Sequence, residues 1–316
     1  MANASAPRKR QQSISPDRTA LQAFVCLLIV GSLLALSLII AKFADEAGAP
    51  RLGFLTLSIA GAGFLLLILN RLQGHDVRLT RRRLEYALLS GVLFALPNAL
   101  GFLAIRHVGT GFVAIAFAFP VLVTWVLALL LRMETLRLSR LTGVLLGLSG
   151  GLVLAVAKAA GMSEDGYWVA LIALIPLVVA AGNIYRTLRW PAGTSAVLLA
   201  ALMMLGGALA LSPFALTLEA MPDTADGRML GWLLAETAVF AVLYIFYFVL
   251  QKLAGPVYLS QIGTVAAVVG TLVAVLLLGE APPPHLGLVV TLVALGTFFF
   301  QRGAATAHGD SRTASD

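Results

Sequence analysis

The chain has 316 residues, of which 59% are hydrophobic and only 12% are charged. Soluble globular domains run near roughly 45–50% apolar and about 25% charged, so this composition excludes an ordinary water-soluble fold and predicts that lipid is the main solvent. The net charge of +7 does not indicate a nucleic-acid partner, because the basic residues lie between apolar segments. A single cysteine, Cys26, excludes an intrachain disulfide, and no cofactor motif or metal-ligand spacing occurs.

Ten apolar segments are long enough to cross a membrane as helices, which need roughly 20 mostly apolar residues. In chain order they are 21–41, 53–70, 86–105, 111–131, 141–157, 168–185, 195–215, 229–250, 257–279 and 285–301. The first is too long for a signal-peptide core, so we expect it to be retained. The runs are continuous rather than alternating, which favours helices over a β-barrel. The predicted fold class is therefore an all-α integral membrane protein with ten transmembrane helices.

The connections between these spans differ sharply in basic charge. If the spans alternate in direction, 17 of the 22 Lys and Arg residues fall on the side that holds both termini. Basic loops stay in the cytoplasm. The sequence therefore predicts a multi-pass protein of the inner (cytoplasmic) membrane with both termini cytoplasmic and with lipid headgroups as the neighbours of its basic loops.

The two halves of the chain align without a gap when one is shifted by 146 residues. The matched pairs are Arg106 and Lys252, Gly109 and Gly255, Glu134 and Glu280, and Gly150 and Gly296. Each half would hold five spans, an odd number, so the second half would enter the membrane from the opposite side. Transporters use such inverted repeats for alternating access. We predict a basic tail (1–20), two five-helix repeats (21–157 and 168–301) and a polar cytoplasmic tail (302–316).

Two segments at matching places in the halves carry a family resemblance. They read IRHVGTGFVAIAFAFPVLVTWVLALLLRMETLRLSRLTGVLLGLSGGLVLA, from Ile105, and LQKLAGPVYLSQIGTVAAVVGTLVAVLLLGEAPPPHLGLVVTLVALG, from Leu250. Each has a short basic turn, small residues, a long apolar span, an acidic residue at the span end and a glycine-rich span. The pattern resembles the EamA repeat of the drug/metabolite transporter superfamily, over roughly residues 21–301.

The resemblance implies ten helices in two inverted repeats around a central cavity. It also implies transport, often export, of metabolites such as amino acids, nucleobases and sugar derivatives. The chain departs from the pattern with RMETL in the first repeat, where GE is usual, and with Ala266 in place of a proline matching Pro120. These departures weaken any transfer of a relative's substrate.

Glu236 is the only ionisable Asp, Glu, His, Lys or Arg inside a predicted span. A charge at depth is costly in a membrane, and such residues often mark a solute or proton pathway. We expect Glu236 to face the central cavity and to bind a proton or a cationic group of the solute. The alternative is a carboxyl near the outer end of the span, about 10 Å in by helical rise, that reaches headgroups or water.

The eighth span also carries a polar and aromatic face. Its members follow spacings of three or four and are Trp232, Glu236, Phe240, Tyr244, Tyr247 and Gln251. The 146-residue shift maps Glu236 to Ser90 and Tyr244 to Asn98, which predicts a second polar stripe on the third span. The residues predicted to bind substrate or a proton are Glu236, Tyr244, Tyr247, Asn98, Ser90 and Gln261. The open alternative is that buried amides hold helices together and that tyrosines belong to an interfacial belt.

Pro120 is the predicted hinge, because a proline inside a span removes a backbone donor and frees a carbonyl. Gly143, Gly147 and Gly151 form two overlapping GxxxG steps, which favour close packing either within the chain or in a dimer, so both a monomer and a homodimer remain open. No catalytic constellation appears, and we expect a non-enzymatic secondary transporter that is probably an exporter of a small polar metabolite. The alternatives are a membrane-embedded lipid-modifying enzyme and a non-transporting assembly subunit.

Overall fold

The computed structural model describes residues 16–109, 112–113, 116–136, 138–159, 166–218, 221–277, 279, 285, 287–292, 294–296 and 298–299. Over these residues the secondary structure is helical, without strands. The predicted basic tail up to residue 15, the whole predicted polar tail 302–316 and parts of the predicted spans 111–131 and 285–301 lie outside them.

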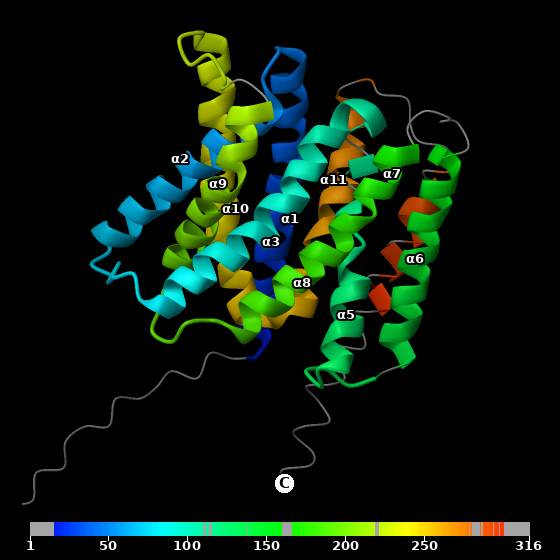
Figure 1. Cartoon of the computed structure of the whole chain (residues 1–316). Coiled ribbons are helices and arrows are strands. Elements are labelled where there is room, and N and C mark those ends of the chain that lie inside the picture. Colours follow the sequence, from blue (N-terminus) through cyan, green and yellow to red (C-terminus); the bar gives the residue numbers. More distant parts are fainter. Residues whose placement is uncertain are drawn as a thin grey trace, which may run out of the picture.

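Helices follow one another through the described part of the chain (Figure 1). They are α1 (Pro16–Glu46), α2 (Arg51–Leu72), α3 (Arg81–Val108), α5 (Pro120–Leu130), α6 (Leu138–Ala159), α7 (Gly166–Ile172), α8 (Leu174–Leu188), α9 (Ala196–Leu218), α10 (Gly227–Leu259) and α11 (Ile262–Leu276). A further short apolar helix spans Gly287–Gly296.

Six helices of the described chain are long and apolar enough to cross a membrane. They are Leu21–Glu46, Arg51–Leu72, Arg81–Val108, Gly166–Leu188, Ala196–Leu218 and Gly227–Leu259. Each contains one predicted span, so these six predictions are confirmed at the level of length and composition. The all-helical fold is compatible with a multi-pass membrane protein.

Prolines explain where the helices depart from the predicted continuous spans. In predicted span 168–185, α7 ends at Ile172 and α8 begins at Leu174. Pro176 has no N–H to bond the carbonyl of Ile172, four residues earlier, so the helical ladder is interrupted there.

Similar breaks shorten two other predicted spans. In predicted span 111–131, a helix begins at Pro120, where a ring without an N–H is tolerated as the first helical residue. In predicted span 257–279, α11 begins only at Ile262. Just before it, α10 is broken at Gly255, whose φ of 76° is readily adopted only by glycine, and Pro256 follows. These breaks put non-helical backbone deep among the helices.

The core is built by helices from the two ends of the sequence. α9 packs against α2 and α3, α1 packs against α10 and α11, and α8 packs against α3 and α5. The α3–α9 contact is backbone to backbone: a Cβ added to Gly206 would lie 2.0 Å from the carbonyl oxygen of Ala87. Gly296 meets the backbone of Gly143 and Gly147 in the same way, so this GxxxG step packs within the chain.

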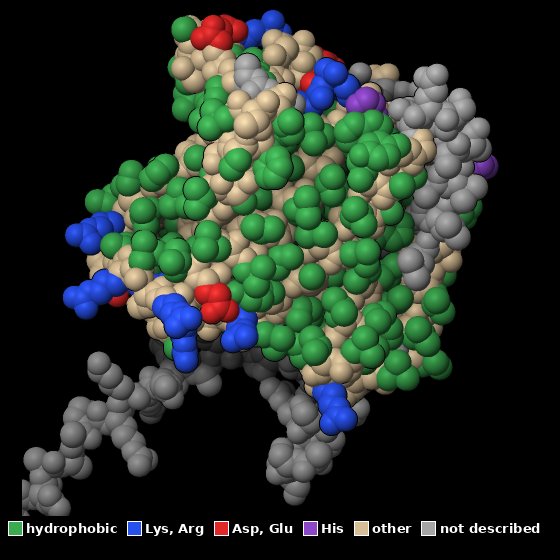
Figure 2. Space-filling view, viewed as in Figure 1, with side chains coloured by type: hydrophobic (Ala, Val, Ile, Leu, Met, Phe, Trp, Pro, Cys, Tyr) green, Lys and Arg blue, Asp and Glu red, His purple; other side chains and the backbone are tan. Residues whose placement is uncertain are grey.

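The described surface separates apolar and charged side chains (Figure 2). On the face shown, hydrophobic side chains cover the middle, while Lys, Arg, Asp and Glu lie toward the two ends of the helices. The α2–α3, α5–α6 and α8–α9 connections, predicted as basic loops of one side, lie at the same end of the molecule (Figure 1). Large exposed side chains such as Phe64, Leu209 and Leu234 belong to the apolar middle, as expected for a surface in contact with lipid.

Candidate functional site

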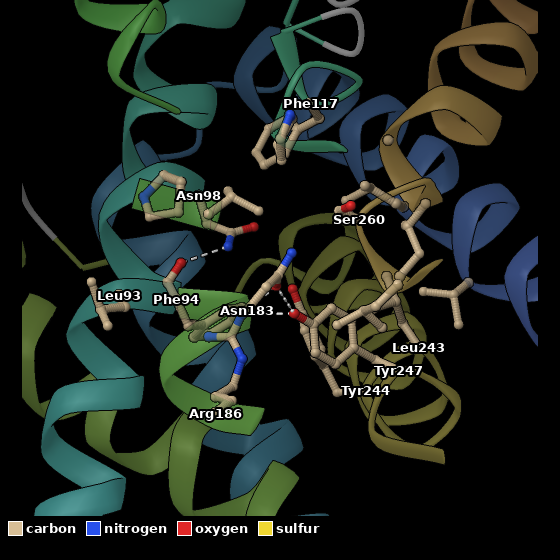
Figure 3. A pocket seen from close by; sticks show the side chains of 18 of the residues that line it. Leu93, Phe94, Asn98, Phe117, Asn183, Arg186, Leu243, Tyr244, Tyr247 and Ser260 are labelled. Atoms are coloured by element: carbon tan, nitrogen blue, oxygen red, sulfur yellow. Dashed lines mark hydrogen bonds between the residues drawn. The ribbon is translucent and has the colours of Figure 1, made fainter. Parts of the chain in front are cut away.

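A cavity lies where α3, α8 and α10 meet the broken segments before α5 and α11 (Figure 3). Its polar lining residues are Asn98, Asn183, Arg186, Tyr244, Tyr247 and Ser260. The rest of the wall is apolar, with Phe94, Phe117 and several aliphatic side chains. The cavity volume is about 60 Å³, room for a few water molecules. A metabolite therefore requires the walls to move apart.

Three side chains at one end of the cavity form a closed hydrogen-bonded triangle (Figure 3). The Tyr247 hydroxyl donates to Oδ1 of Asn183 over 2.5 Å, and Nη2 of Arg186 donates to the same oxygen over 2.8 Å. Nη2 also donates to the Tyr247 hydroxyl over 2.6 Å. The guanidinium carbon lies 5.4 Å from the centre of the Tyr247 ring, within range of a cation–π contact. These bonds fix the guanidinium at the cavity wall.

The sequence analysis missed Arg186, which it placed in a cytoplasmic connection just beyond the predicted span 168–185. The structure places it inside the apolar stretch Gly166–Leu188, only 3% exposed. Glu236 is therefore not the only buried ionisable residue within a membrane-length helix, and that interpretation was wrong. The available signal was the spacing of Val179, Asn183 and Arg186, which puts all three on one helix face.

Four of the predicted functional residues line the cavity. Tyr244 and Tyr247 project from α10, and the Tyr244 ring meets Phe94 edge-on, with centroids 4.9 Å apart. Asn98 donates from Nδ2 to the backbone carbonyl of Phe94 over 2.7 Å. Pro120, the predicted hinge, lies in the wall at the start of α5. The predicted pairing of Tyr244 with Asn98 by the 146-residue shift thus brings both residues to one cavity.

The other three predicted residues are buried but are not among the residues that line this cavity. Ser90 donates to the carbonyl of Tyr86 in its own helix. Gln261 lies between two lining residues, Ser260 and Ile262, at the break before α11. Both therefore occupy the protein interior beside the site rather than its wall.

Glu236 faces α1 rather than the cavity described here. Its side chain is 0% exposed, and Oε1 accepts a hydrogen bond from the Ser37 hydroxyl over 2.5 Å, while Oε2 has no partner. Eight residues separate it from Tyr244, which is about 12 Å along a helix. The shared stripe on α10 therefore reaches two different neighbours: the cavity at Tyr244 and the α1 contact at Glu236. The alternative of a carboxyl exposed at the headgroup level is not what the structure shows.

Comparison with known proteins identifies a shared fold only. No family model matches the sequence, and no curated protein matches it. A solved structure described as "Crystal structure of protein" superimposes with a TM-score of 0.68 at 18% sequence identity, covering 90% of this chain and 98% of that chain. At this identity the likeness concerns the arrangement of the helices and carries no information about function.

Proposed function

We propose that this protein is a secondary transporter of the EamA type that its sequence resembles. It carries a small polar metabolite, such as an amino acid or a related compound, across the cytoplasmic membrane in the direction of export. The observation that carries the proposal is a polar cavity enclosed by long apolar helices, with lining groups from both halves of the chain. Ligand sites of transporters lie at such repeat interfaces, next to discontinuous helices.

Helix boundaries support an inverted two-repeat architecture with ten helices, because they recur at the 146-residue shift. The corresponding positions are the helix starts Arg81 and Gly227, the helix ends Leu72 and Leu218, the helix ends Leu130 and Leu276, and the breaks at Gly109 (φ 79°) and Gly255 (φ 76°). Packing recurs as well: α1 meets α10 and α11, and α8 meets the corresponding α3 and α5. α3 and α10 run in opposite directions (Figure 1), as inversion requires.

Alternating access assigns a role to the broken segments. The cavity wall contains Pro120 at the start of α5, and Ser260 and Gly263 at the corresponding break before α11. Backbone without a continuous hydrogen-bond ladder bends at lower cost than a regular helix. In the proposed cycle these two breaks are the hinges by which the cavity opens to one side and then to the other.

Transport itself is tested by reconstitution. We expect liposomes that contain the purified protein to exchange one or more members of a panel of radiolabelled amino acids and small organic acids faster than protein-free liposomes. Asn183→Ala should slow this exchange by about tenfold or more, because Arg186 and Tyr247 lose a shared acceptor. Leu209→Ala, on an exposed apolar position, is the matched control and should leave the rate unchanged. An exchange rate no higher than in protein-free liposomes for the whole panel would argue against transport.

The orientation is tested by cysteine labelling. We expect a cysteine at Arg78, in the basic α2–α3 connection, to react with a membrane-impermeant maleimide only after cells are opened. A cysteine at Asp223, in the exposed α9–α10 connection, should react in intact cells. The expectation rests on the positive-inside rule and on the 17-to-5 partition of basic residues. The reverse labelling pattern would invert the proposed topology.

A further inference from the structure

We propose that Arg186 is an anion-binding residue and that the solute of the cavity is an organic monocarboxylate with an apolar body. The inference rests on the proposed transport function and narrows its substrate class. It is carried by a buried cation in the cavity wall with unused hydrogen-bond donors, in surroundings that supply no counter-charge.

The first step is the state of the guanidinium. Arg186 is 3% exposed and lines the cavity, and an arginine stays protonated in proteins. Nη2 uses its bonds on Asn183 and Tyr247, whereas Nε and Nη1 have no hydrogen-bond partner. Buried donors without a partner are costly, so this side of the guanidinium is a built but unsatisfied site.

The second step is the missing counter-charge. Within the described residues no carboxylate forms an ion pair with Arg186, and none of the cavity-lining residues is acidic. Glu236 is engaged with Ser37 on α1. The groups that hold Arg186 are neutral: the Asn183 amide oxygen, the Tyr247 hydroxyl and the Tyr247 ring face. They orient the cation without neutralising it, so the charge remains available to an anion.

The third step selects the anion. The cavity presents one cation, Arg186, which balances a single negative charge, whereas a phosphate at neutral pH carries more than one. Around it stand rings and aliphatic side chains, including Phe94, Phe117 and Tyr244, which suit an apolar body. A carboxylate also accepts the strong charge-assisted bonds that guanidinium N–H groups donate. A cationic solute would face Arg186 with no compensating acid in the wall.

Gly182 holds the guanidinium in place from below. It lies one helical turn before Arg186, and a Cβ added to it would lie 2.9 Å from Nη1 and 3.3 Å from Cζ. The guanidinium is therefore folded back over the bare backbone of Gly182, and an alanine there displaces the charge from the cavity without removing it. Gly231, also helical, has nothing within 4 Å of an added Cβ and supplies a matched control.

Binding is measured on the purified full-length protein in detergent, as the rise of the thermal unfolding midpoint with ligand concentration at constant ionic strength. The probes are benzoate, benzamide and benzylamine, which share a ring and differ in charge, together with isobutyrate, isobutyramide and inorganic phosphate. We expect at least one carboxylate to bind about tenfold or more tightly than its amide, and benzylamine to bind no better than benzamide. Arg186→Gln should reduce this preference to about twofold or less.

Further variants keep the test decisive if Arg186→Gln fails to fold. Gly182→Ala should reduce the carboxylate preference, Arg186→Lys should retain part of it, and Gly231→Ala should leave it unchanged. The proposal is overturned if both carboxylates bind no better than their amides, if the preference persists in Arg186→Gln or Gly182→Ala, or if phosphate binds more tightly than either carboxylate. Since binding is scored without transport, carboxylate binding in a protein that moves no solute would refute the transporter and leave the anion site. Flux that is indifferent to charge and to Arg186 would do the opposite.

Discussion

Gly263→Ala is expected to lower the thermal unfolding midpoint strongly and to abolish solute exchange. An ideal Cβ at this position would lie 1.3 Å from the carbonyl oxygen of Phe117 and 2.1 Å from its carbonyl carbon. These are backbone atoms, which cannot swing aside as a flexible side chain does, so α11 must move away from the segment before α5. Overpacking of this kind costs about 1–3 kcal/mol or more. Gly263 and Phe117 both line the cavity, so the shift would also reshape the site.

The measurement is thermal unfolding in detergent, followed by exchange in liposomes. Gly231→Ala again serves as the matched control, because alanine favours a helix over glycine by about 1 kcal/mol and finds open space there. It should therefore keep or slightly raise the midpoint. An unfolding midpoint and exchange rate for Gly263→Ala equal to those of the unchanged protein would show that the close contact of the two broken segments does not constrain the fold.

The helical fold could be predicted from the sequence because hydropathy acts over whole segments. Each predicted span from 21–41 to 86–105, and from 168–185 to 229–250, lies within one of the six membrane-length stretches of the described structure. What composition could not predict were the breaks. A proline such as Pro120 or Pro176 is compatible with a kinked helix or with two separate ones, and the surrounding packing decides between them.

The candidate site could be predicted only in part. Tyr244, Tyr247 and Asn98 were found because helical spacing and the 146-residue shift both concern local geometry. Arg186 was missed because a cutoff at the end of an apolar run assigns any basic residue to the adjoining loop, whereas α8 continues to Leu188. Glu236 was correctly identified as lying within a span, but which neighbour it faces depends on how α1 packs against α10, and helical spacing alone does not specify that.

Glu236 is expected to couple transport to protons from a position outside the cavity. The carboxyl is fully buried, has one oxygen bonded to Ser37 and one without a partner, and takes part in no ion pair among the described residues. An unpaired charge at this depth is costly. The group therefore holds a proton while α1 and α10 are in contact, and it can release the proton only when that contact opens to water. The contact would thus be the proton gate of the transport cycle.

The test is Glu236→Gln, which keeps the shape and the bond to Ser37 but cannot release a proton. In liposomes with an imposed gradient of one pH unit, the unchanged protein should concentrate its solute up to about tenfold for each proton coupled. The Gln variant should exchange solute at equal pH, yet reach no accumulation under the gradient. Thr237→Val, at the next position on α10, where the hydroxyl contacts the Ser58 carbonyl of α2, controls for a disturbed helix and should still accumulate solute. Equal accumulation by Glu236→Gln, or none by the unchanged protein, would show that this carboxyl only joins α10 to α1, and the driving force would then have to enter through the cavity itself.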